Sequence, residues 1–184
     1  MISFIGNRPA IQIGPYQVLD YDTAWLDDAL HRAARAADHE DFPLVSEIRS
    51  GVEMYLEHKC ALRLLHLEEL FERMRKMLVK IGCERIAEKL EPLAPPLTIS
   101  LVEAASSAGN GFELAFFENI RAELTVLHRA GAEIIRFTEL RECTLILRGE
   151  KKWNKRCESL LAEIQAFLKA CDHEVGLAKL SIEA

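Results

Sequence analysis

Apolar and polar positions in the first half of the chain follow two spacings. Residues 11–13 and 17–19 are mainly apolar and lie on either side of Gly14 and Pro15, which predicts a short β-hairpin around a Gly-Pro turn. Further along, apolar residues recur with the spacing of one face of an α-helix. The pattern therefore predicts helices along the apolar stripes at residues 26–37, 45–56 and 67–81.

A cluster of prolines follows these helices. Gly82 is predicted to end the third helix, and a short fourth helix is predicted at residues 85–91. Pro92, Pro95 and Pro96 come next, and proline stops a helix because it lacks the backbone N–H and restricts the residue before it. We place a domain boundary at this cluster. The resulting division is a helical domain at 1–92, a second domain at 97–172 and a tail at 173–184.

The second domain mixes short apolar runs with helical stripes. Residues 97–102 predict a strand, residues 106–111 a loop, and residues 112–129 a helix with Gly131 as its C-cap. Two further strands are predicted at 133–137 and 143–147, and a last helix from about Asn154 to Cys171. The predicted fold class is therefore α+β: a β-hairpin plus four helices, then a small α/β module in the order strand, helix, strand, strand, helix.

Part of the first half resembles a known family. The sequence Val-Leu-Asp-Tyr-Asp at residues 18–22, the helix at 26–34, and the segment from His66 to Ala87 are similar to the ATP-cone, a small regulatory domain of ribonucleotide reductases and related regulators. The resemblance covers about residues 11–91, half of the chain. It implies a β-hairpin packed with four helices, and a role in sensing ATP or dATP.

The positions that hold the nucleotide in that family differ in this chain. The family's Lys-Arg-Asp-Gly sequence is replaced by residues 13–16, a further lysine by Trp25, and a hydroxyl residue before the third helix by His66. Converging cations are needed to hold three phosphates, so the resemblance implies a degenerate ATP-cone-like fold. The alternative is that ATP or dATP sensing survives, with Arg8, Tyr16 and Trp25 arranged around the nucleotide.

Composition narrows the class of protein. The chain has 184 residues, 49% of them hydrophobic, which predicts folded domains rather than disorder. No run approaches the roughly 18 apolar residues that span a bilayer, and the N-terminus lacks a signal-peptide pattern. We therefore expect a cytoplasmic protein without membrane association. The net charge of -6 argues against a protein that coats nucleic acid through its overall field.

The cysteines and histidines indicate neither disulfides nor a metal centre. The chain has five cysteines and no CxxC pair, so a disulfide framework and a zinc ribbon are both disfavoured. Cys157 and Cys171 fall on one face of the predicted last helix, which suits core packing. We expect free, mostly buried thiols and no metal site.

One segment concentrates positive charge around a tryptophan. Two interpretations stay open for it. The cations could hold a phosphate or an RNA or DNA backbone while the indole stacks on a base. Alternatively, the tryptophan opens the apolar stripe of the last helix and the cations form a solvated turn, which is the interpretation we favour. The residues are Arg148, Lys151, Lys152, Trp153, Lys155 and Arg156.

The pattern as a whole favours binding over catalysis. No serine, histidine and acid set, and no cysteine and histidine set, can be assembled from the spacing. We expect a non-catalytic regulatory or interaction protein that binds a protein partner or forms a homodimer. The alternatives are a surviving ATP or dATP sensor and a nucleic-acid-binding protein that uses residues 148–156.

Overall fold

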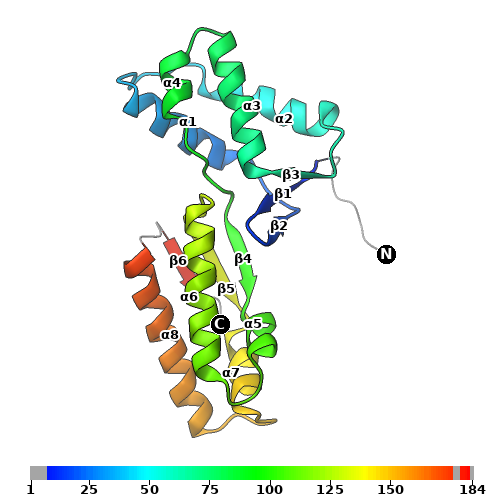
Figure 1. Cartoon of the computed structure of the whole chain (residues 1–184), viewed down its shortest axis with the longest axis vertical. Helices are drawn as coiled ribbons and strands as arrows, with labels where there is room; N and C mark the ends of the chain where they lie inside the picture. The colour runs from blue at the N-terminus through cyan, green and yellow to red at the C-terminus, as the bar shows by residue number, and fades with distance from the viewer. Residues whose placement is uncertain (1–7, 176–178, 183–184) are drawn as a thin grey trace. The chain divides into compact units, whose positions relative to one another are not determined.

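The computed structural model describes residues 8–175 and 179–182, and the chain divides into two compact units (Figure 1). The N-terminal unit is Met1–Pro95 and the C-terminal unit is Pro96–Ala184. The division falls inside the proline cluster, where no helix or strand connects the two sides. Each unit has its own three-stranded sheet and its own core, so each is described by itself.

The N-terminal unit contains the predicted hairpin and one strand that the pattern did not predict. The strands β1 (Ala10–Ile13) and β2 (Tyr16–Val18) pair antiparallel, with Gly14 in the left-handed region at φ 54°. The strand β3 (Leu64–His66) pairs parallel to β1, so the sheet order is β2-β1-β3. β1 is therefore the central strand.

The helices of this unit follow the predicted apolar stripes. Leu26, Leu30, Leu56, Phe71 and Leu78 are fully buried, and together they form much of the core. A π-helical turn, η1, directly follows the second helix. The Cys60 N–H donates to the carbonyl of Tyr55, five residues earlier, as is typical of a π-helix. The elements are α1 (Ala24–Ala36), α2 (Val45–Met54), η1 (Tyr55–Lys59), α3 (Leu67–Lys80) and α4 (Glu84–Lys89).

The C-terminal unit is built on a parallel sheet with the order β4-β5-β6. Two helices connect each strand to the next. The elements are β4 (Leu97–Ser100), α5 (Leu101–Ala108), α6 (Glu113–Arg129), β5 (Ile134–Thr138), α7 (Leu140–Arg148), α8 (Lys155–Val175) and β6 (Lys179–Ile182). The mixed α+β class is confirmed.

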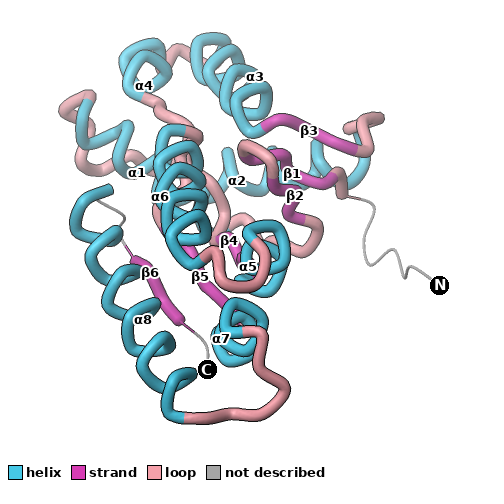
Figure 2. The backbone as a smooth tube through the Cα atoms, turned by 60° about the horizontal axis from the view of Figure 1, so that its bottom comes forward, coloured by secondary structure: helices cyan, strands magenta, loops and turns pink. Residues whose placement is uncertain are grey.

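The long helices α6 and α8 lie side by side on one face of this sheet (Figure 2). Alternate strand residues face them, and Ile99, Ile135 and Phe137 are almost fully buried there. Thr98 and Arg136, which pair across β4 and β5 on the opposite face, are exposed. The shorter helices α5 and α7 pack against each other beyond the ends of β4 and β5.

The predicted strand at residues 143–147 is wrong, because this segment lies within α7. Leu140, Cys143 and Leu147 are buried with the spacing of one helix face. The Thr144 hydroxyl is also buried, and it donates to the Leu140 carbonyl at 2.8 Å. This local bond satisfies a β-branched polar residue inside a helix. The observed element order is strand, helix, helix, strand, helix, helix, strand.

Two other predictions for this unit are also wrong. Half of the expected loop at 106–111 is helical, because α5 runs from Leu101, directly after the strand ends at Ser100, to Ala108. The expected tail at 173–184 contains parts of two elements: α8 continues to Val175, and β6 pairs parallel to β5. None of the helices in the described ranges combines the length and the apolar character needed to cross a lipid bilayer.

Four helices end with the same backbone turn but not with the same residue. α3, α6 and α7 are followed by Gly82, Gly131 and Gly149, each in the left-handed region. α1 is followed there by Asp38, at φ 60°, and the His39 N–H donates back to the Ala34 carbonyl at 2.9 Å. A non-glycine residue in this conformation is unfavourable, and a carboxylate at a helix C-terminus adds to the cost.

Replacement of Asp38 by glycine should therefore stabilise the N-terminal unit by about 1 kcal/mol. Urea unfolding followed by Trp25 fluorescence in a Trp153→Phe background would measure this, because the remaining tryptophan then reports on this unit alone. Asp38→Asn is the matched control and should recover about 0.3 kcal/mol, since it removes the charge but keeps the side chain. A loss of stability in Asp38→Gly would contradict the assigned turn.

Candidate functional site

Arg8, the cation predicted to contact a nucleotide, is bound within the protein. Its Nε and Nη2 atoms donate to Glu57 Oε1 at 2.9 and 2.5 Å, and its Nη1 donates to the Tyr21 carbonyl at 3.3 Å. The hydrogen bonding of the Arg8 guanidinium to the Glu57 carboxylate is the main reason why the pKa of Arg8 is raised. The positive charge predicted for phosphate binding is thus neutralised by a carboxylate of η1.

Tyr21 and Thr23 extend this contact into a polar network. The Tyr21 hydroxyl donates to the Pro9 carbonyl at 2.8 Å, and the Thr23 hydroxyl is hydrogen-bonded to the Glu53 carboxylate. Tyr21 is buried, and this burial raises the pKa of its hydroxyl to about 12. The network joins the residues before β1, the segment before α1, and α2 with η1.

Trp25 and Tyr16, the other two residues predicted for a nucleotide site, lie in different settings. Trp25 is buried in α1, where its Nε1–H donates to the Asp22 carbonyl at 2.8 Å and its ring centroid lies 6.0 Å from that of Phe71. Tyr16 is half-buried at the start of β2. Arg8 and Trp25 thus both have structural contacts in the core or at its margin.

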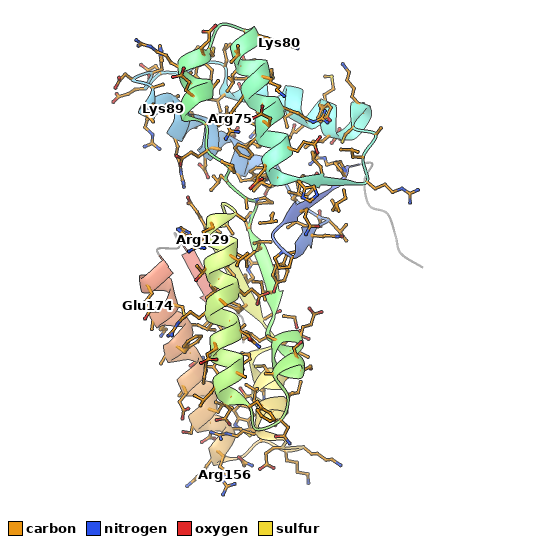
Figure 3. All side chains as sticks on the ribbon, viewed as in Figure 1. Arg75, Lys80, Lys89, Arg129, Arg156 and Glu174 are labelled. Carbon is orange, nitrogen blue, oxygen red and sulfur yellow. The ribbon has the colours of Figure 1, made fainter. Side chains whose placement is uncertain are left out.

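The basic segment lies at one end of the C-terminal unit. α5 and α7 end there, while α6 and α8 begin there, and Figure 3 shows Arg156 at the start of α8. The connecting loops touch, because the Gly111 N–H donates to the Leu147 carbonyl at 2.9 Å. Gly149 is held close to Asn110, so that a Cβ added at Gly149 would collide with the Asn110 side chain.

The cations of residues 148–156 differ in their exposure to solvent, which the sequence did not indicate. Arg148 is withdrawn from solvent by an ion pair with Glu113 at 2.6 Å. Arg141, which the pattern did not single out, instead places its guanidinium 4.4 Å from the centroid of the Trp153 ring. Lys151, Lys152, Lys155 and Arg156 are exposed.

Trp153 does not open the apolar stripe of the last helix, which corrects that part of our favoured interpretation. α8 begins at Lys155, and Trp153 is half-buried in the segment before it. Asn154 caps the helix, since its Oδ1 accepts from the backbone N–H groups of Arg156 and Cys157 at 2.9 and 3.1 Å. The predicted helix start at about Asn154 is therefore confirmed.

Two exposed apolar side chains lie at the same end of the C-terminal unit as these cations. Phe112 is 63% exposed and Leu114 is 80% exposed, on either side of the Glu113 that pairs with Arg148. Sequence patterning gave no signal for them, because one apolar residue at each position fits the start of an amphipathic helix. An exposed apolar pair at the same end of a unit as several exposed cations is a surface suited to binding.

A pocket of about 220 Å³ lies in the N-terminal unit, between α2 with η1 on one side and α3 on the other. Its wall is mainly apolar, and the Arg73 guanidinium lies over the Tyr55 ring at 5.6 Å from its centroid. The pocket was not predicted, because its wall combines residues from helices that the pattern cannot pair. The lining residues are Gly51, Val52, Tyr55, Leu70, Arg73, Met74 and Met77.

Polar groups at the carboxyl ends of β4 and β5 pair with one another. The Ser100 hydroxyl is hydrogen-bonded to the Glu139 carboxylate, and the Thr138 hydroxyl donates to the Ile99 carbonyl at 3.5 Å. Glu139 itself adopts a left-handed conformation at φ 61°. This edge is where open parallel sheets often bind ligands, but here α5 and α7 begin directly from it.

The cysteines are free thiols, and those of the C-terminal unit are buried. Burial raises the pKa of Cys143 to about 12 and also raises the pKa of Cys171. Within residues 8–175 and 179–182, no group of three or more His, Cys, Asp or Glu side chains is placed to hold a metal ion.

Comparison with known proteins yields no match of any kind. No protein-family model matches the chain, no curated protein matches its sequence, and no solved structure matches its fold.

The burial of Tyr21 predicts a specific alkaline titration. Tyrosine ionises near pH 10 in an unfolded chain, so the folded protein holds the Tyr21 proton more tightly. The resulting stability is fully present below about pH 10 and is lost as the pH rises toward 12. Absorbance at 295 nm should show a tyrosine ionising near pH 12, and Tyr21→Phe should remove that step, whereas the titration of Tyr55, whose pKa burial also raises, should remain. Ionisation of all three tyrosines near pH 10 would contradict this network.

Proposed function

We propose that this chain is a non-catalytic regulatory protein that binds another protein through one end of its C-terminal unit. The observation that carries this proposal is the exposure of a phenylalanine and a leucine at the end of the unit that also carries several exposed cations. We call this surface the basic–apolar end. It consists of Phe112, Leu114, Lys151, Lys152, Lys155 and Arg156.

The energetics of the basic–apolar end favour a protein partner with acidic and apolar side chains. Burying an exposed phenylalanine or leucine stabilises a complex by roughly 1.5–3 kcal/mol per side chain. The cations would accelerate association with an acidic segment and orient it, an effect that salt weakens. The loop that presents Phe112 is held by the bond between Gly111 and Leu147, so ordering it on binding costs little.

The N-terminal unit supports a regulatory role through its resemblance to a nucleotide-sensing domain. Its hairpin, two helices, charged third helix and short fourth helix, with the strand β3 before the third helix, are compatible with the resemblance to the ATP-cone described above. Arg8 is paired with Glu57, so a triphosphate would have to compete with a carboxylate for it. We therefore propose a degenerate ATP-cone-like unit in which nucleotide sensing is lost and protein interaction is retained.

Nucleic-acid binding is the second candidate function for the basic–apolar end. It is favoured by the exposure of four cations around Trp153. The Arg141 guanidinium, which lies over the Trp153 ring, adds a fifth cation to this surface. Arg141 already covers one face of the indole, however, which leaves less of the ring for a base. The exposed Phe112 and Leu114 fit a protein partner better than a phosphate backbone.

Photo-cross-linking tests the protein-binding function. With p-benzoyl-phenylalanine in place of Leu114, irradiation in a cell extract should give a covalent adduct of defined mass, because this position would lie inside the interface. The same probe at Val126, which is also exposed on α6, is the matched control and should give none. The adduct should be a protein and should disappear in Lys151→Glu/Lys152→Glu. Equal yields from both positions, or none from Leu114, would exclude this surface.

Fluorescence anisotropy with single-stranded RNA and DNA tests the second candidate. Binding through these cations should weaken steeply as salt rises, because bound counterions are released from the nucleic acid. It should be lost in Lys151→Glu/Lys152→Glu/Lys155→Glu and retained in Lys169→Glu, an exposed lysine near the other end of α8. Phe112→Ser/Leu114→Ser should leave it unchanged. No binding at low salt would remove nucleic acid as a partner.

A further inference from the structure

The pocket between α2 with η1 and α3 differs in chemistry from every other surface described above. It holds about 220 Å³, and its wall is formed mainly by aliphatic, thioether and aromatic groups. An apolar cavity of roughly 150 Å³ in another protein is known to bind benzene. The volume here fits a ring system somewhat larger than benzene, of about nine or ten non-hydrogen atoms.

The charge at the pocket is already compensated. Arg73 lines the pocket, but its Nη2 atom lies 2.6 Å from Glu69 Oε1, and its Nε also donates to that oxygen at 3.1 Å. The guanidinium also lies over the Tyr55 ring. An anionic ligand would have to displace Glu69 from Arg73, whereas an uncharged ligand would leave the pair intact. The pocket therefore favours an uncharged molecule.

The lining favours an aromatic ring over an aliphatic chain of the same size. Met74 and Met77 supply thioether sulfurs, which make favourable contacts with aromatic rings of about 0.3–1.5 kcal/mol each. Tyr55 adds an aromatic surface against which a second ring can stack or pack edge-on. Unbranched methionine side chains also adapt their shape to a flat guest.

Backbone features at the same place keep the pocket open. Gly51 is in the middle of α2 and has an ordinary helical conformation, so the backbone does not require glycine there. A Cβ added at Gly51 would meet no atom within 4 Å. Glycine inside a helix costs about 0.5–1 kcal/mol of stability relative to alanine. Gly51 forms part of the pocket wall and has no side chain that could occupy the pocket. The π-helical turn begins at Tyr55, and such turns are frequent at functional sites.

We infer that this pocket is a binding site for a small, uncharged aromatic molecule with one or two fused rings. The ring lies between Gly51 and Met77, against Tyr55, and buries its faces on the thioethers of α3. The inference concerns the N-terminal unit and goes beyond the proposed protein-binding function, whose basic–apolar end belongs to the C-terminal unit. Either one can therefore fail without the other.

The test is a titration of the full chain with indole, followed by ¹H–¹⁵N chemical shifts and by the melting temperature. Indole should bind saturably, shift the amide signals of Gly51, Tyr55 and Met77, and raise the melting temperature. Gly51→Leu should weaken binding by about tenfold or more, since its side chain fills the pocket and also suits a helix. Gly51→Ala is the matched control and should bind within about threefold of the unmodified chain.

A second variant and two other probes make the test decisive. Met77→Glu, which places a carboxylate at the pocket, should also weaken indole binding by about tenfold. Cyclohexanol, an uncharged aliphatic ring, should bind more weakly than indole. ATP should not compete with indole. Equal binding of indole to Gly51→Leu, binding of cyclohexanol as tight as that of indole, competition by ATP, or no saturable binding would each overturn the inference.

Discussion

Both units depend on the pairing of one short central strand. β1 and β5 each carry two almost fully buried side chains, Ile11 and Ile13 in the first and Ile135 and Phe137 in the second. A backbone segment buried this deeply must have its N–H and C=O groups paired on both edges. β2 and β3 meet that requirement in the N-terminal unit, and β4 and β6 in the C-terminal unit. The helices then cover the apolar faces that these sheets create.

This constraint explains how far the sequence could predict the fold. Long stripes of helical spacing, such as those of α3 and α6, were predicted almost to their ends, because local periodicity reflects a buried face. β3 and β6 were missed because each is a strand of a few residues whose hydrogen bonds are made to a distant segment. The run from Cys143 to Leu147 was assigned to a strand, although Leu140, Cys143 and Leu147 share one helix face.

The candidate sites were less predictable than the fold, because their chemistry is set by partners far away in the chain. The positive charge of Arg8 is paired with the Glu57 carboxylate, and that of Arg148 is paired with the Glu113 carboxylate. Neither pairing leaves a trace in local spacing. The sequence could indicate the concentration of cations around Trp153. All of these cations except Arg148 are exposed in the structure. A pocket lined by residues of two separate helices likewise cannot be predicted until their packing is known.

The parallel pairing of β6 with β5 also has a consequence for how the protein is made. Chains fold as they leave the ribosome, N-terminal domains first. All the strands of the N-terminal unit emerge by His66, whereas β5 must wait for the whole of α7 and α8 before β6 can cover its second edge. For that interval an apolar strand offers unpaired backbone groups to its surroundings. A pause in translation between residues 139 and 178 would thus prolong the state in which nascent chains are most prone to associate wrongly.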